Sequence, residues 1–383
     1  MRAPIIRGLC AVAVGAAIVP LGLASTADAT VSPACRAHHA TVYVVNQGSG
    51  TVTPIGTATN TAGKEINVGK DPYDIAITPN GRTAYVTHVA TFPPGIVTPI
   101  RLATGTAGTP IKFGQGPQVI AITPNGRTVY AVDMGPGTVT PIRTATNTVG
   151  KPIPVGSFPF AIAITPNGKT AYVANAGENT VTPIRIATNT ALKAISIGNI
   201  QETPVDIAIT PNGRTAYALT FNAVIPIKTA TNTAGKPITI PGFNSVRIGE
   251  TLIAITPNGK TVYVASPSAG TVTPISTATN KAGKPIEVGK DPFDLAITPN
   301  GKVVEVVNQL SNTVTPIFTA TNRAGKPTPV GSRPWAVAIT PDSRTAYVVN
   351  NGSNTVTPVS TVTGKAGQPI SVGSAPVAIA IMR

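Results

Sequence analysis

Short apolar runs alternate with turn-forming residues along nearly the whole of this chain. Between residues 74 and 114 four such runs are separated by turns rich in Pro, Asn, Gly and Thr, and they lie at 75–77, 82–86, 96–101 and 110–113. The Asn80-Gly81 pair after the first run is a strong hairpin signal, because both residues tolerate a positive φ. Valine and tyrosine favour a pleated surface, and no stretch keeps a helical period. The segment therefore predicts four short antiparallel strands.

This unit recurs at a nearly fixed period. The phrase Ile-Thr-Pro-Asn-Gly starts at Ile77, Ile122, Ile164, Ile209, Ile255 and Ile297, and the variant Ile-Thr-Pro-Asp-Ser starts at Ile339. The prolines of these phrases are 42 to 46 residues apart. Repeats of this length with four strands each are typical of β-propeller blades. A parallel β-helix uses shorter coils, and helical repeats would not tolerate this much Pro, Gly and Thr.

The two ends of the chain supply parts of one unit. The apolar run 377–381 is an eighth innermost strand, whereas the second-strand run 41–46 precedes any innermost strand. We expect these ends to share a blade, which closes the ring and removes exposed strand edges. The predicted fold class is all-β, a β-propeller of eight four-stranded antiparallel blades, with seven blades as the alternative. Residues 40–383 are expected to form this single domain.

A proline in every third strand conflicts with regular pairing. These prolines are Pro54, Pro99, Pro141, Pro183, Pro226, Pro274, Pro316 and Pro358. Proline cannot donate a hydrogen bond and normally lies at sheet edges or bulges. We expect either a bulge at this position or a fourth strand that pairs only in part.

The second strands carry a recognisable phrase, such as Tyr-Val-Thr-His at 85–88 and Tyr-Val-Ala-Asn at 172–175. Together with the preceding Ile-Thr-Pro-Asn-Gly and the following Thr-Ala-Thr-Asn, this phrase resembles the YVTN-repeat β-propeller family from about residue 40 to the end. The resemblance implies a propeller that is exported or surface-associated. Neighbouring propellers include lactonases, an antibiotic lyase and electron-transfer domains, so the resemblance implies architecture far better than activity.

Two departures from that family stand out. The family's third strand usually ends in Val-Ile-Asp, whereas here Pro-Ile is followed in four copies by Arg101, Arg143, Arg185 and Lys228. In addition, Glu305 occupies the position of the repeat tyrosine. Either Glu305 has drifted at an exposed edge, which is the interpretation we favour, or it is a buried acid with a raised pKa.

The N-terminus predicts export. Arg2 and Arg7 precede an apolar run at 8–24, and 27–29 is a small-x-small cleavage site. The run is short for a membrane anchor, so residues 1–29 are predicted to be a signal peptide and 30–39 a lead into the propeller. Cys10 would leave with the signal, and Cys35 would then have no partner for an intramolecular disulfide. No transmembrane span is expected after cleavage.

Positive charge is concentrated in the turns at one end of the blades. The chain has 29 basic and 14 acidic residues, a net charge of +15. The turns between the first and second strands carry Arg82, Arg127, Lys169, Arg214, Lys260, Lys302 and Arg344, and we expect Lys64, Lys151, Lys236, Lys284 and Lys326 at the same end. The only carboxylate in these turns is Asp342. Such a surface either docks an anionic polymer or membrane surface, or the basic residues recur only because the turn sequence was copied with each repeat. Without interleaved aromatic residues it does not predict specific binding of nucleic acid.

The opposite end predicts a small-ligand site. Asp74, Asp206 and Asp294 enter innermost strands in three copies, and aromatic residues lie beside the same positions at Tyr73, Phe160, Phe293 and Trp335. Carboxylates and aromatics around a channel mouth form a plausible pocket, and oxygen ligands of this kind suit calcium. Alternatively, each aspartate caps the backbone of its own turn, as Asp commonly does.

Catalytic motifs are absent from the sequence. There is no Gly-x-Ser-x-Gly elbow, no cysteine or histidine set with zinc spacing, and only His88 is a candidate axial ligand for haem. Two functions stay open. The first is an exported, non-catalytic propeller that binds an envelope polymer, a polysaccharide or a protein. The second is a channel-mouth enzyme, lactonase- or lyase-like, that acts on a small molecule with or without calcium.

Overall fold

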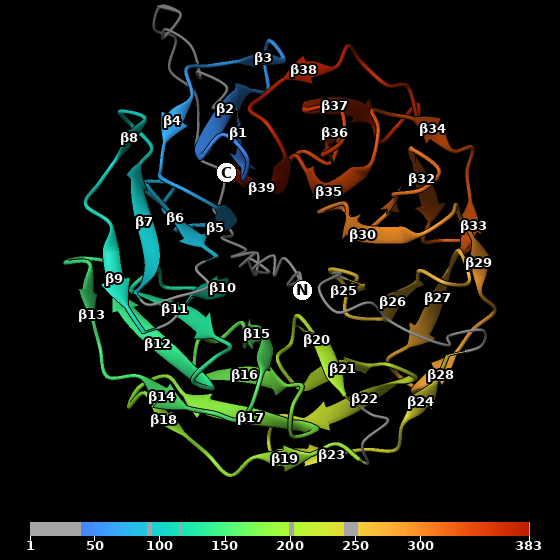
Figure 1. The fold of residues 1–383 in the computed structure, drawn as a ribbon. Coiled ribbons are helices and arrows are strands. Elements are labelled where there is room, and N and C mark those ends of the chain that lie inside the picture. Colours follow the sequence, from blue (N-terminus) through green and yellow to red (C-terminus); the bar gives the residue numbers. More distant parts are fainter. Residues whose placement is uncertain (1–39, 90–93, 115, 199–202, 241–251, 383) are drawn as a thin grey trace, which may run out of the picture.

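The described residues form a ring of eight antiparallel sheets around a central axis (Figure 1). The computed structural model describes residues 40–382 except 90–93, 115, 199–202 and 241–251. Seven of the blades follow one another along the chain, and they are blade 2 (β5–β9), blade 3 (β10–β14), blade 4 (β15–β19), blade 5 (β20–β24), blade 6 (β25–β29), blade 7 (β30–β34) and blade 8 (β35–β38). The described part of the chain contains no helix, and so no helix there is long and apolar enough to span a membrane.

Each blade has three main strands of six or seven residues, except that β25 of blade 6 spans three described residues. The innermost strands are β5 (Pro72–Ile77), β10 (Pro117–Ile122), β15 (Pro159–Ile164), β20 (Pro204–Ile209), β25 (Ile253–Ile255), β30 (Pro292–Ile297), β35 (Pro334–Ile339) and β39 (Pro376–Met382). The second strands are β1 (Thr41–Asn46), β6 (Thr83–His88), β11 (Thr128–Asp133), β16 (Thr170–Asn175), β21 (Thr215–Thr220), β26 (Thr261–Ser266), β31 (Val303–Asn308) and β36 (Thr345–Asn350). The third strands are β2 (Thr51–Gly56), β7 (Gly95–Arg101), β12 (Thr138–Arg143), β17 (Thr180–Arg185), β22 (Ala223–Lys228), β27 (Thr271–Ser276), β32 (Thr313–Phe318) and β37 (Thr355–Ser360).

The fourth strand of each blade is broken. Its first fragments are β3 (Thr61–Ala62), β8 (Thr106–Ala107), β13 (Thr148–Val149), β18 (Thr190–Ala191), β23 (Thr233–Ala234), β28 (Lys281–Ala282) and β33 (Arg323–Ala324). Its second fragments are β4 (Ile66–Asn67), β9 (Ile111–Phe113), β14 (Ile153–Pro154), β19 (Ile195–Ser196), β24 (Ile238–Thr239), β29 (Ile286–Glu287), β34 (Thr328–Pro329) and β38 (Ile370–Ser371). In blade 8 the first fragment is reduced to an isolated antiparallel β-bridge between Val359 and Ala366.

The third-strand proline explains this break. Pro54 pairs with Tyr43 without a register shift, so there is no bulge at the proline. Its carbonyl oxygen accepts a hydrogen bond from Gly63 N (2.7 Å) in the fourth strand. Since the N and O of a strand residue face the same neighbour, the missing proline N–H also faces the fourth strand, and pairing stops there. The expectation of a partly paired fourth strand is confirmed.

The ring closes as predicted, with eight blades rather than seven. Blade 1 consists of β1–β4 from the N-terminal part and β39 from the C-terminus. Val42 pairs with Ile381 and Val45 with Ala378 in an antiparallel register. Figure 1 shows these two ends of the described chain side by side. Two-stranded overlap of the ends covers both strand edges that an open array would expose.

The turn between the first two strands differs from the predicted hairpin. In Thr78-Pro79-Asn80-Gly81 only Gly81 has a positive φ, at 66°. Asn80 instead accepts a hydrogen bond through its side-chain oxygen from Thr78 Oγ1 (2.7 Å). The loop is closed by Gly81 N donating to Thr78 O (2.8 Å). This loop is thus a four-residue turn that uses the rigid φ of proline and the free φ of glycine.

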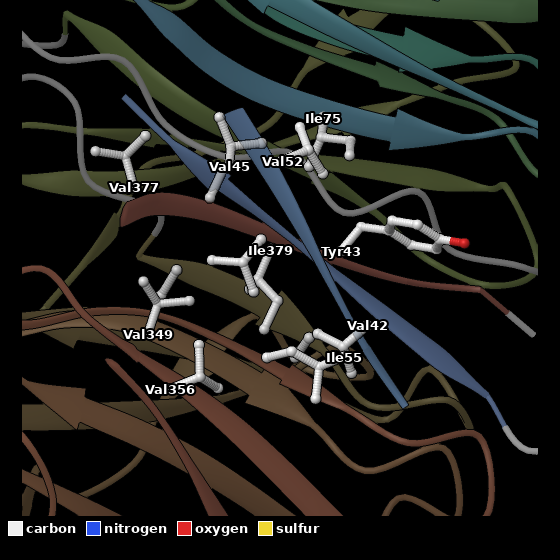
Figure 2. Packing of buried hydrophobic residues seen from close by; sticks show 14 of the residues in the cluster. Val42, Tyr43, Val45, Val52, Ile55, Ile75, Val349, Val356, Val377 and Ile379 are labelled. Carbon is white, nitrogen blue, oxygen red and sulfur yellow. The ribbon is translucent and has the colours of Figure 1, made fainter. Parts of the chain in front are cut away.

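The core lies between the blades. Figure 2 shows Val349 and Val356 of blade 8 beside Val377 of the closing strand, with Ile75 of blade 2 on the other side of blade 1. All belong to one buried cluster. Because successive side chains of a strand point to opposite faces, each blade buries both of its faces against its neighbours.

Candidate functional site

The seven basic turn residues lie on one end of the ring, and all seven are exposed. Leu102 N, which follows the third strand of blade 2, donates to Arg82 O (3.0 Å). The same bond links Thr144 to Arg127 and Ile186 to Lys169 in the next two blades. These bonds hold the first and third turns of a blade together, so the turns meet at the same end. A cation therefore stands at this end in every blade from 2 to 8.

Four further cations join this end, at the positions where the third strands depart from the sequence of the family that the chain resembles. Register places Arg101 opposite Thr83 and Arg143 opposite Thr128, directly beside the basic turns. Arg185 and Lys228 take the same position in blades 4 and 5, and all four side chains are exposed. Blades 2 to 5 thus carry two exposed cations each. The pairing of the third strand with the second strand is the signal that could have predicted the position of these four cations.

The five lysines of the fourth strand do not belong to this end. Lys64 follows β3, whose Ala62 pairs with Ile55, and precedes β4, whose Ile66 pairs with Val52. Lys64 therefore lies halfway along the outer edge of the blade. Lys151, Lys236, Lys284 and Lys326 occupy the same break in their blades. The expectation that they share the basic end is wrong, because the fourth strand runs away from it.

Asp342 is the carboxylate of these turns, and it serves its own loop. It is exposed, and its side chain accepts hydrogen bonds from Thr340 Oγ1 (2.6 Å) and Arg344 N (3.0 Å). The bond from the threonine, with smaller contributions from Arg344, lowers the pKa of Asp342 below its ordinary value. The negative charge of Asp342 is thus partly balanced within its own loop, and the seven exposed cations leave this end of the ring positively charged.

The three aspartates of the predicted channel-mouth site are buried between blades, with 1 to 3% of each residue exposed. Asp74 accepts a hydrogen bond from Ile75 N (2.7 Å) and another from Ile120 N (3.2 Å) in the next blade. Asp206 likewise accepts from Ile207 N and, across the junction, from Leu252 N (3.2 Å). Each carboxylate therefore connects the innermost strands of two blades.

Asp294 completes the set by accepting from Val337 N (2.8 Å) of blade 8. Burial raises the pKa of Asp206 to about 7, against the lowering effect of its backbone hydrogen bonds, and the charge of Asp294 adds to the rise. Asp74 and Asp206 each accept a hydrogen bond from the N–H of the following residue, which agrees with the interpretation that an aspartate caps its local backbone. The cross-blade bond is the feature that sequence analysis missed.

The aromatic residues near these aspartates are buried as well. Tyr73, Phe160, Phe293 and Trp335 are each less than 10% exposed. Phe293 and Trp335 contact each other across the junction of blades 7 and 8, with ring centroids 4.5 Å apart and an interplanar angle of 47°. A ligand-binding role for the three aspartates and four aromatics stays a prediction, and any ligand would compete with these contacts.

The last residue of each second strand forms a further buried polar position. Asn46, Asn175, Asn308 and Asn350 donate through Nδ2 to threonines of the third strand at 2.8 to 3.1 Å. In blade 3 the same position is Asp133, whose pKa burial raises to about 7 while bonds from Thr140 and Thr138 oppose the rise. These polar side chains join strands within a blade.

His88 takes this position in blade 2. Its Nδ1 lies 2.8 Å from Lys70 O and its Nε2 2.9 Å from Thr98 Oγ1. Burial lowers the pKa of His88, and its Nδ1 donates to Lys70 O because a carbonyl oxygen can only accept. Both nitrogens are engaged, which leaves no lone pair for haem iron. Among the described residues no three His, Cys, Asp or Glu side chains gather to hold a metal ion.

Comparison with known proteins supports the architecture. No family model matches the chain, and no curated protein matches it in sequence. Among solved structures, dihydro-heme d1 dehydrogenase NirN superposes with a TM-score of 0.76 at 15% identity over 89% of this chain and 74% of NirN. AztD from Citrobacter koseri gives 0.64 at 11% over 90% and 97%, and Kuenenia stuttgartiensis hydrazine synthase gives 0.61 at 22% over 77% and 96%.

At these identities the likenesses show the fold alone. The chain is an eight-bladed β-propeller whose structural neighbours include enzymes. Its likeness to the YVTN-repeat family stays a resemblance carried by the repeat phrases.

Proposed function

We propose that this protein is an exported, non-catalytic binding module whose basic end docks an anionic polymer of the cell envelope. The observation that carries the proposal is the exposed cation in the first turn of each blade from 2 to 8. Four more exposed cations in blades 2 to 5 strengthen it. The expected partner is an envelope polymer or a polysaccharide with anionic groups, and a protein partner with an acidic surface is the remaining case.

Physical chemistry favours a polymer over a small anion. Exposed single charges interact weakly and are screened within about 8 Å at physiological salt. A polymer with repeated anionic groups gains from many weak contacts at once, which compensates for the weakness of each. Cations that recur once per blade around a ring present such a multivalent surface. Export rests on the N-terminal pattern at 1–29, which lies outside the described residues.

The alternative function is a channel-mouth enzyme. The observation in its favour is the pKa of Asp206 near 7, a value suited to a general base at neutral pH. However, the Asp206 carboxylate accepts hydrogen bonds from Ile207 N and Leu252 N. Asp206 is also only 2% exposed, so a substrate could reach its carboxylate only if the two blades moved apart. The binding module therefore accounts better for the arrangement.

The test compares two polymers that differ only in charge. The purified protein is titrated with dextran sulfate and with neutral dextran of equal length, at low and high salt. We expect binding of the sulfated polymer alone, weakening as salt rises. Equal binding of both polymers, or no binding of either, contradicts the proposal.

A matched pair of triple variants locates the surface. Arg127→Glu, Lys169→Glu and Arg214→Glu reverse three cations of the basic end. Each cation near an anionic surface contributes about 1 kcal/mol, so reversal is expected to weaken binding by about a hundredfold or more. The control, Lys151→Glu, Lys236→Glu and Lys284→Glu, makes the same change of net charge on the outer edge. An equal loss of polymer affinity in both variants would show a general effect of net charge. The proposal that the basic end is the docking surface would then be wrong.

A further inference from the structure

Six junctions between blades share one outer link, a tyrosine hydroxyl that donates to an asparagine of the next blade. The oxygen-to-oxygen distances are 2.5 to 2.8 Å. The pairs are Tyr85–Asn147, Tyr130–Asn189, Tyr172–Asn232, Tyr217–Asn280, Tyr263–Asn322 and Tyr347–Asn60. The phenol ring fills the space between the blades, and its hydroxyl is satisfied at the far side.

The junction between blades 7 and 8 lacks both partners. Glu305 stands where blade 7 should carry the tyrosine, and Gly364 stands where blade 8 should carry the asparagine. Two neighbouring repeat positions also change, since Phe318 replaces a small or basic residue and Val362 replaces the alanine of Thr-Ala-Thr-Asn. Four departures from the repeat thus meet at one junction. At the junction of blades 1 and 2 only the asparagine is lost, to Gly105, and Tyr43 still provides its ring.

A groove of about 660 Å³ lies at this junction, and Glu305, Phe318, Val362 and Gly364 all line it. Phe318 and Val362 are 45% and 77% exposed, so both present apolar surface to a ligand in the groove. The exposed Lys326 and Lys365 also line the groove. The groove therefore combines apolar walls, two cations and one acid.

Glu305 is buried in this groove, so our sequence-based expectation of drift at an exposed edge is wrong. Only 2% of the residue is exposed, and its Oε2 has no hydrogen-bond partner among the described residues. Burial raises the pKa of Glu305 to about 7. A buried oxygen without a partner is unfavourable, and a ligand that donates a hydrogen bond to it would remove this penalty.

We propose that the groove binds a small phenol that carries an anionic substituent. The ring takes the place that the repeat tyrosine fills at the other junctions, and its hydroxyl donates to the Glu305 carboxylate. The ring packs against Phe318 and Val362, and the anionic substituent interacts with Lys326 and Lys365. The same two lysines disfavour a purely cationic ligand, although an ammonium group would also pair with the carboxylate.

The first experiment uses probes that separate these features. Isothermal titration of the purified full chain at pH 8 compares 4-hydroxyphenylacetate with phenylacetate, p-cresol and tyramine. We expect 4-hydroxyphenylacetate to bind about tenfold more tightly than phenylacetate, which lacks the hydroxyl, and more tightly than p-cresol, which lacks the anion. No binding of any probe overturns the proposal. Tighter binding of tyramine also overturns it, because the groove would then select an ammonium.

The second experiment fills the groove with the link of the other junctions. The double variant Glu305→Tyr and Gly364→Asn restores the repeat residues, so it is expected to fold and to melt at a higher temperature than the wild type. It should no longer bind 4-hydroxyphenylacetate. Unchanged binding in this folded variant would place the ligand elsewhere and overturn the assignment. The double variant Lys326→Ala and Lys365→Ala should lose the preference for 4-hydroxyphenylacetate over p-cresol. A retained preference would show that the two lysines do not bind the anionic substituent.

Discussion

The inner and outer edges of the blade junctions are joined by different chemistry. At the inner edge, Asp74, Asp206 and Asp294 bind backbone N–H groups of the next blade, at three junctions. At the outer edge, a neutral tyrosine–asparagine pair recurs at six junctions. The outer link is part of the repeat, whereas the inner link occurs only where a copy happens to carry an aspartate.

This difference teaches that the two edges respond to different conditions. A phenol–amide hydrogen bond involves no charge near neutral pH, because burial moves the pKa of Tyr85 and Tyr172 further up, to about 12. A buried carboxylate either loses its hydration or takes up a proton. The inner link at Asp206 is therefore sensitive to pH, whereas the tyrosine–asparagine link of the outer edge is not.

The largest expected effect is a loss of stability as pH rises. Burial raises the pKa values of Asp133, Asp206 and Glu305 to about 7, so the folded state holds protons that the unfolded chain releases near pH 4. The contribution of each group is fully present below about pH 4 and is lost as pH rises to about 7, at about 1.4 kcal/mol per pH unit. Urea denaturation between pH 5 and pH 8 measures the decline.

The variant Asp206→Asn sharpens this prediction. It keeps the shape of the side chain and one acceptor oxygen but cannot titrate, so its free energy of unfolding should fall less steeply over the same range. Identical slopes for the variant and the wild type would show that Asp206 does not hold a proton in the folded state.

Removing the inner link altogether is expected to cost about 3 kcal/mol. Asp206→Ala leaves the N–H groups of Ile207 and Leu252 without their acceptor in a buried site. The free energy of unfolding is best measured at pH 5, where the wild-type carboxyl is protonated and carries no desolvation penalty for charge. Exposed Glu287→Ala is a control for the loss of an acidic residue. Equal stability of Asp206→Ala and the wild type would mean that the cross-blade bonds contribute nothing.

The two edges also differ in how far the sequence could predict them. The repeat phrases predict the blades and their number, because each strand within a unit pairs with its neighbour in the chain, and the incomplete units at 41–46 and 377–381 predict the closure. Tyr172 and Asn232 are both repeat residues, yet they are 60 positions apart and meet only once the ring is formed. The partners of Asp206 are backbone N–H groups, which every residue except proline supplies, so no sequence signal could identify them.

The smallest expected effect tests the outer link. Tyr172→Phe removes the hydroxyl that donates to Asn232 Oδ1 (2.7 Å) and approaches Thr229 O (3.3 Å), and it should cost about 1 kcal/mol at any pH between 5 and 8. Tyr43 provides the matched control, because Gly105 stands where its asparagine partner would be. Tyr43→Phe is therefore expected to change the free energy of unfolding by less than about 0.5 kcal/mol. If both substitutions cost the same, the hydrogen bond contributes nothing. The outer edges of the blades would then be joined by packing of the tyrosine rings alone.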